Sequence, residues 1–133
     1  MILALCIDDR GGMSFNGRRQ SMDRAVRRDL LLEAGDAPLW VSGYTARQFD
    51  PDPRLRVCDA PEEEAGAGEV CFLELGDPMP LLARAEKLIL YRWNRSYPAE
   101  STYALPPAGW KLLSQVEFPG HSHPRITKEV YLP

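Results

Sequence analysis

Met1-Ile-Leu-Ala-Leu-Cys-Ile7, then Asp8-Asp9-Arg10, then Gly11-Gly12-Met13-Ser14-Phe15-Asn16-Gly17, is the stretch that decides the fold. The apolar start predicts a strand that is buried on both faces of a sheet. The glycine-rich run predicts a loop that can take positive φ and approach a ligand closely. A helix is expected next, with Ser21 as its N-cap and Asp23 in its first turn.

The rest of the chain continues to alternate strands with helices. Gly35 predicts the left-handed end of the first helix, and Pro119-Gly120 predicts the turn of a closing antiparallel hairpin. We expect strands over 39–42, 55–58, 70–75, 87–93, 110–118 and 126–132, helical turns over 46–49 and 79–85, and a mobile acidic loop over 61–68. This order indicates one α/β domain over residues 1–133, with a mixed, mostly parallel central sheet flanked by helices.

The bulk composition is that of an ordinary soluble domain, with 44% apolar and 26% charged residues. No apolar run approaches the ~20 residues of a membrane span, and no basic signal segment precedes the first strand. We therefore expect a cytoplasmic protein of bacterial type with no membrane partner. Cys6, Cys58 and Cys71 lack metal-ligand spacing and are expected to be reduced thiols. The net charge of −3 gives no reason to expect nucleic-acid binding.

The order of strand, Gly-Met loop and helix with one acid resembles the start of dihydrofolate reductases. Gly12-Met13 matches the mobile-loop element of that family, and Asp23 matches the acid that contacts the pterin. Gly43-Tyr44-Thr45 stands where the family carries a Gly-Arg-x-Thr turn, and Ala85-Glu86-Lys87-Leu88 leads into a strand as in the family. The resemblance implies a short, divergent member with a dihydrofolate-reductase-like α/β fold over the whole chain.

The residues that the family uses for NADPH differ here. Tyr44 replaces the arginine that helps hold cofactor phosphate. Leu75-Gly76-Asp77-Pro78 replaces the paired glycines before a helix N-terminus, so an acid faces the phosphate and one backbone N–H is lost. We therefore expect a degenerate NADPH site and no cofactor, with NADPH as the alternative. The expected remnants of the cofactor site are Gly43, Tyr44, Thr45 and Gly76.

The residues that match the family's substrate site differ less from the family pattern than those that match its NADPH site. The leading hypothesis is that the protein binds a small anionic or heteroaromatic ligand without standard NADPH-dependent reduction. Arg18 and Arg19 would neutralise an anion, Asp23 would pair with a ring N–H, and Phe15 would stack on the ring. The candidate ligand-binding residues are Cys6, Gly12, Met13, Phe15, Arg18, Arg19 and Asp23. For Asp23, a purely structural charge at the helix N-terminus is the alternative.

Two enzymatic alternatives stay open. The first is an NADPH-dependent reductase of a pterin-like substrate, in which Asp23 is the catalytic proton donor or relay. The second is a metal-dependent phosphodiesterase, in which Asp8, Asp9 and Asp23 would hold the metal. Neighbouring acids at the end of a strand are more typical of turns, because adjacent side chains of an extended chain point apart.

Other polar and aromatic clusters are interpreted structurally. His121 and His123 are expected in an exposed hairpin turn rather than at a metal. Tyr91 and Trp93 are expected on one face of a strand, and with their arginine neighbours they are the best surface candidate for a partner. A sheet edge left by a shortened cofactor region would favour a homodimer.

Overall fold

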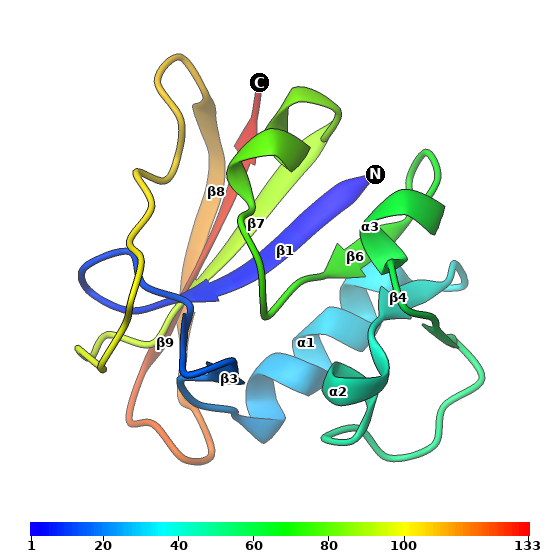
Figure 1. The fold of residues 1–133 in the computed structure, drawn as a ribbon, viewed down its shortest axis with the longest axis horizontal. Coiled ribbons are helices and arrows are strands. Elements are labelled where there is room, and N and C mark those ends of the chain that lie inside the picture. Colours follow the sequence, from blue (N-terminus) through cyan, green and yellow to red (C-terminus); the bar gives the residue numbers. More distant parts are fainter.

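A seven-stranded sheet forms the centre of the molecule, with strand order β5-β4-β6-β1-β7-β9-β8 (Figure 1). The computed structural model describes all residues, 1–133. The strands are β1 Ile2–Ile7, β4 Leu39–Val41, β5 Leu55–Val57, β6 Val70–Phe72, β7 Lys87–Arg92, β8 Lys111–Phe118 and β9 Ile126–Leu132. β1, β4, β5, β6 and β7 run parallel, whereas β9 pairs antiparallel with both β7 and β8. The predicted mixed, mostly parallel sheet with a closing hairpin is confirmed.

Both faces of the sheet are covered, which explains why β1 is apolar throughout. Helix α1 (Arg24–Ala34) packs Val26 and Leu30 on one face, in the same cluster as Ala4. The 3₁₀ helix η1 (Met79–Ala83) and the end of α3 (Pro61–Glu64) cover the other face, in the cluster that holds Leu3 and Leu5. Successive strand residues alternate between the two faces, so both sets of β1 side chains are buried.

Three local expectations about the helices are wrong. Asp23, not Ser21, is the N-cap of α1: its Oδ1 accepts the Ala25 N–H at 2.8 Å. The next helical turn is α2 (Gly43–Ala46), because the Ser42 hydroxyl caps it by accepting the Thr45 N–H. The acidic stretch contains α3, which starts with a proline and has three glutamates in its first turn, a favourable pattern at a helix N-terminus.

The glycine-rich loop contains a small hairpin that the sequence analysis did not predict. β2 (Ser14–Phe15) pairs with β3 (Arg18–Arg19), and the two residues between them have positive φ, 52° at Asn16 and 68° at Gly17. An Asn-Gly pair with this geometry is the preferred two-residue hairpin turn. The turn projects Phe15 and Arg18 from the sheet. No helix in the structure is long and apolar enough to cross a membrane.

Candidate functional site

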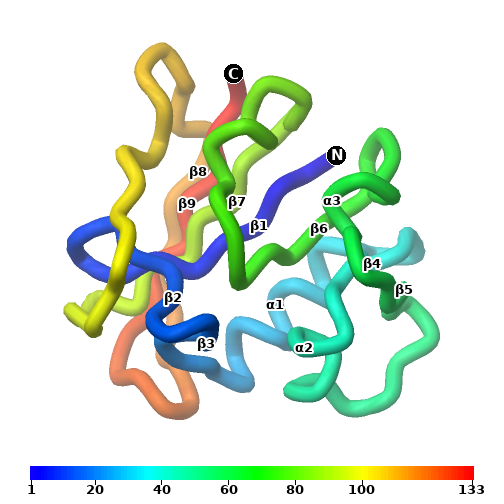
Figure 2. Tube along the Cα trace, in the orientation of Figure 1, coloured from blue at the N-terminus to red at the C-terminus, as the bar shows by residue number.

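Polar side chains gather at the carboxyl ends of the parallel strands, which is the usual ligand-binding edge of an open α/β sheet. Asp8 follows β1, Ser42 follows β4, Glu74 lies just beyond β6, and Trp93 follows β7. The β2–β3 hairpin, the start of α1, α2 and the turn between β8 and β9 lie around this edge (Figure 2). Segments from the whole length of the chain therefore contribute to one site.

Asp23 is the centre of this site, and its carboxylate is fully buried. Oδ1 accepts the N–H groups of Ala25 and His121, at 2.8 and 2.9 Å. Oδ2 accepts the N–H groups of Ser122 and His123, at 2.8 and 3.2 Å, and lies 2.9 Å from His123 Nδ1. Burial alone would raise the pKa of Asp23, but these hydrogen bonds outweigh it and lower the pKa to about 2. Asp23 is thus an ionised carboxylate that ties the start of α1 to the turn between β8 and β9.

Gly120 lets the β8–β9 turn close around Asp23. A Cβ at Gly120 would lie 2.5 Å from the His123 carbonyl oxygen and 2.7 Å from Asp23 Oδ2. Both distances are shorter than van der Waals contact, so only glycine fits this approach. The sequence predicts a turn at Gly120, but nothing in its pattern indicates that this turn contacts Asp23.

His123 is buried, so the prediction of an exposed histidine turn is wrong for it, although His121 is exposed. Its ring stacks on Trp93 with centroids 4.5 Å apart and an interplanar angle of 21°. An ionised carboxylate only accepts, so His123 Nδ1 donates to Asp23, and Nε2 is the ring nitrogen that faces two hydroxyl groups. Nε2 lies 3.1 Å from Ser21 Oγ and 3.0 Å from Tyr97 Oη.

The burial of Trp93 and Tyr91 also corrects the expectation of an aromatic surface patch. Both side chains belong to the core cluster under α1, and Tyr91 donates its hydroxyl to Asp29 at 2.6 Å. They share one face of β7, as predicted from strand alternation. They are therefore not free to bind a partner.

Glu74 is a second buried acid at the site, and the sequence analysis missed it. Its carboxylate accepts Arg19 Nε and Nη2 at 2.9 and 3.1 Å, the Thr45 hydroxyl at 2.8 Å and the Gln48 amide at 2.9 Å. The Arg19 guanidinium also lies over the Tyr44 ring, 4.1 Å from its centroid. The charge of Arg19 is therefore balanced within the chain.

Asp8 organises the glycine-rich loop. Its oxygens accept the N–H groups of Arg10, Gly12 and Tyr97 at 2.8–3.0 Å, and the Gln20 amide at 3.2 Å. Burial raises the pKa of Asp8, but these hydrogen bonds outweigh it, so the pKa is lowered overall. Asp8 is thus a turn former, as its position at a strand end suggests. No group of three or more His, Cys, Asp or Glu side chains is placed to hold a metal ion.

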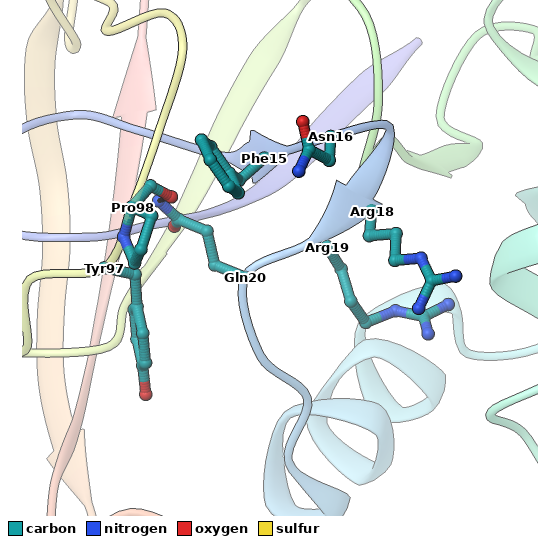
Figure 3. Close-up of a pocket in the computed structure, with 7 residues that line it drawn as sticks. All are labelled: Phe15, Asn16, Arg18, Arg19, Gln20, Tyr97 and Pro98. Carbon is teal, nitrogen blue, oxygen red and sulfur yellow. Dashed lines mark hydrogen bonds between the residues drawn. The ribbon is translucent and has the colours of Figure 1, made fainter.

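Two open grooves meet at the β2–β3 hairpin and share Arg18, Arg19 and Gln20. The first has a volume of about 500 Å³ and is otherwise lined by Phe15, Asn16, Tyr97 and Pro98 (Figure 3). Figure 3 shows the Arg18 and Arg19 side chains extending side by side, away from Tyr97 and Pro98. The second groove has a volume of about 690 Å³ and is otherwise lined by Ser21, Met22, Tyr44, Arg47 and Ser122.

The other candidate ligand residues differ in whether their side chains line a groove or are buried. Met13 is buried in the core cluster opposite α1, and Gly12 is buried against Ala99 and Gln20. Cys6 is half-buried on β1, and burial together with the carboxylates of Glu74 and Asp23 raises the pKa of its thiol. Phe15 and Arg18 are exposed on the hairpin. Of the candidate residues, Phe15, Arg18 and Arg19 line the grooves.

Comparison with known proteins identifies the architecture. No protein-family model and no curated protein matches the chain by sequence. Among solved structures, the dihydrofolate reductase from Enterococcus faecalis complexed with NADP(H) and RAB-propyl matches with a TM-score of 0.68. The match covers 99% of this chain and 95% of that chain, at 12% sequence identity. The fold is that of the dihydrofolate reductases. At this identity the likeness establishes the fold alone.

Within this dihydrofolate-reductase-like fold, the residues at the expected cofactor turns do not fit a pyrophosphate. The Thr45 hydroxyl donates to Glu74, and the Tyr44 ring lies under Arg19. Gly76 has a φ of 93°, but Asp77 follows it and accepts the Met79 N–H at 2.9 Å. Two carboxylates thus stand close to the turns that would meet phosphate oxygens.

Proposed function

We propose that this dihydrofolate-reductase-like protein binds a small anionic or heteroaromatic ligand in the two joined grooves, without standard NADPH-dependent reduction. The observation that carries the proposal is the uncompensated positive charge along them. Arg18 and Arg47 are exposed groove residues that form no salt bridge, whereas Arg19 is paired with Glu74. An exposed arginine presents donors in a geometry that suits carboxylate and phosphate groups.

The first groove also offers apolar contact for a ring. Phe15 is 42% exposed at the tip of the hairpin, and Tyr97 and Pro98 form the facing wall. Gln20 lies between the two walls, and its Oε1 is buried without a hydrogen-bond partner. A buried acceptor without a donor is costly, so a ligand N–H that reached Gln20 would gain a strong hydrogen bond. A ring carrying an N–H and an acidic group matches both grooves.

Asp23 serves this site through other groups rather than by touching the ligand. Its carboxylate is fully buried, and both oxygens are occupied by the chain's own donors. We propose that Asp23 positions the β8–β9 turn and the His123 ring, which in turn position Ser21 and Tyr97 beside the grooves. Reduction of a pterin-like substrate with NADPH is the alternative, favoured by the fold's likeness to a reductase solved with NADP(H).

A binding experiment with charge variants tests the proposal. Folate and adenosine monophosphate are titrated separately against the wild-type protein, Arg18→Ala and Arg47→Ala, with thermal unfolding as the readout. At least one ligand is expected to raise the melting temperature, and each arginine variant is expected to weaken that ligand about 5- to 50-fold, as for one lost charged hydrogen bond. Lys111→Ala removes a charge from the edge strand β8 and should leave affinity unchanged. Equal affinity of all four proteins would contradict the proposed site.

A further inference from the structure

Ser21, His123 and Asp23 form a hydrogen-bonded chain that ligand binding alone does not require. The Ser21 hydroxyl lies 3.1 Å from His123 Nε2, and His123 Nδ1 lies 2.9 Å from Asp23 Oδ2. A serine, an imidazole and a buried carboxylate in this order form the arrangement that activates a serine nucleophile.

Local backbone geometry brings the two outer members to the same ring. Ser21 and Asp23 lie two residues apart in the segment between β3 and α1, and Asp23 has an extended backbone, with φ −149° and ψ 132°. Ser21 and Asp23 accordingly meet the two nitrogens of His123, while Met22 between them is 50% exposed. Trp93 stacks on the ring and fixes its plane.

The serine also faces an open site with room for a substrate. Ser21 is half-buried and lines the second groove together with Arg18, Tyr44 and Arg47. No hydrogen bond within the chain occupies the backbone N–H groups of Ser21 and Met22. The site thus combines a nucleophile, a base, spare donors and positive charge.

We infer that Ser21 is a nucleophile, with His123 as its general base and Asp23 as the positioning residue, and that the second groove hydrolyses esters of small anionic acids. The inference rests on the proposed function only for the placement of the substrate's negative group near Arg18 and Arg47.

The reaction balances with water as the only co-reactant. Ser21 Oγ forms a bond to the ester carbonyl carbon, and its proton moves to His123 Nε2. The bond from that carbon to the alkoxy oxygen breaks, and the leaving oxygen takes the proton from His123. Water then attacks the acyl-serine and gives one proton to His123, which returns it to Ser21 as the acid leaves.

Tyr97 adds a second hydroxyl group at the His123 nitrogen that contacts Ser21. Its hydroxyl lies 3.0 Å from the same Nε2, so it competes with Ser21 for the single lone pair of a neutral imidazole. Removal of that hydroxyl leaves Ser21 as the only partner of Nε2. Tyr97→Phe is therefore expected to react at least as fast as the wild-type protein.

Covalent labelling with an uncharged alkyl fluorophosphonate, followed by mass spectrometry, tests the nucleophile independently of anion binding. We expect a single adduct on Ser21, none in Ser21→Ala, retained labelling in Ser114→Ala, and labelling at least about 100-fold slower in His123→Gln. Ser114 is the control, because it is an exposed serine on β8 that lines neither groove. The Tyr97→Phe variant keeps the test decisive if His123→Gln does not fold.

Hydrolysis of 4-nitrophenyl hemisuccinate against 4-nitrophenyl acetate then tests the substrate class. We expect the anionic ester to have the higher kcat/KM, with that preference reduced about 10-fold or more in Arg18→Ala. Folded wild-type and Tyr97→Phe proteins that are not labelled would overturn the inference, even if folate or nucleotide binding persists. Labelling of Ser21 without any ligand binding would instead support the nucleophile and contradict the proposed anion groove.

Discussion

Asp23 joins the start of α1 to a turn 100 residues later along the chain. Its four backbone hydrogen bonds and its contact with His123 stabilise the ionised form, so the folded protein binds this proton less tightly than the unfolded chain does. A carboxyl with a lowered folded pKa contributes stability that is complete above its ordinary pKa of 3.8 and is lost as the pH falls towards about 2.

The pH dependence of unfolding measures this contribution. Between pH 5 and pH 2 the wild-type free energy of unfolding should fall by about 2 kcal/mol more than that of Asp23→Asn, from 1.36 kcal/mol per pKa unit. Urea titrations at several pH values provide the measurement. Asp52→Asn is the control, because the pKa of Asp52 is also lowered to about 2, by the Arg54 guanidinium, at a half-buried position outside the site. Identical pH profiles for wild type and Asp23→Asn would refute the role of Asp23.

Gly120 is the second residue on which the site depends. Gly120→Ala would force the turn away from Asp23 Oδ2 and the His123 carbonyl, and should destabilise the fold by about 1–3 kcal/mol. Gly43→Ala is the matched control, since no atom lies within 4 Å of a Cβ there and φ is not positive. Denaturant unfolding compares the free energies of unfolding of the two variants. Equal values would show that the fold does not depend on the close contact between Gly120 and Asp23.

At the scale of elements, the sequence was informative wherever a pattern is local. The buried strand β1, the helix ended by Gly35 and the closing hairpin β8–β9 follow from apolar periodicity and turn residues. The site was less predictable, because its members come from distant elements. Nothing near His123 in the sequence indicates a carboxylate partner, and Glu74 meets Arg19 only after β3 folds over α2. The Asn16-Gly17 hairpin is different, since its dipeptide is a sequence signal in itself.

The two edge strands of the sheet, β5 and β8, differ in length and in the apolar surface that they expose. β5 is three residues long, whereas β8 spans Lys111–Phe118 and exposes Leu113 and Val116 by 58% and 53%. A long exposed strand with apolar side chains favours pairing with a second copy. We therefore propose that, if the homodimer expected from the sequence forms, it forms through β8 rather than through the shortened cofactor side.

Light scattering tests this assignment. The wild-type protein should show a dimer at high concentration, and Val116→Lys should shift it to the monomer because charge on an edge strand opposes pairing. Val57→Lys, on the short edge β5, is the control and should leave the dimer intact. A wild-type monomer at all concentrations would reject pairing through β8.

At the scale of the whole molecule, the dihydrofolate-reductase-like fold carries buried acids at one part of its ligand-binding edge and exposed arginines at another. Glu74 and Asp77 stand at the turns where phosphate would be expected, while the free arginines line the grooves beside the β2–β3 hairpin. The central claim is that the protein binds a small anionic or heteroaromatic ligand in place of NADPH, because acids stand at the expected phosphate turns and unpaired arginines line the grooves. A ligand that binds only the folded state raises the melting temperature by mass action, so the melting temperature shows which of these ligands the protein binds.

The most direct measurement is the melting temperature of the wild-type protein with NADPH, compared with folate and with adenosine monophosphate at the same concentrations. The account predicts no rise with NADPH and a concentration-dependent rise with at least one of the other two. A concentration-dependent rise with NADPH would contradict the account and favour the alternative of an NADPH-dependent reductase.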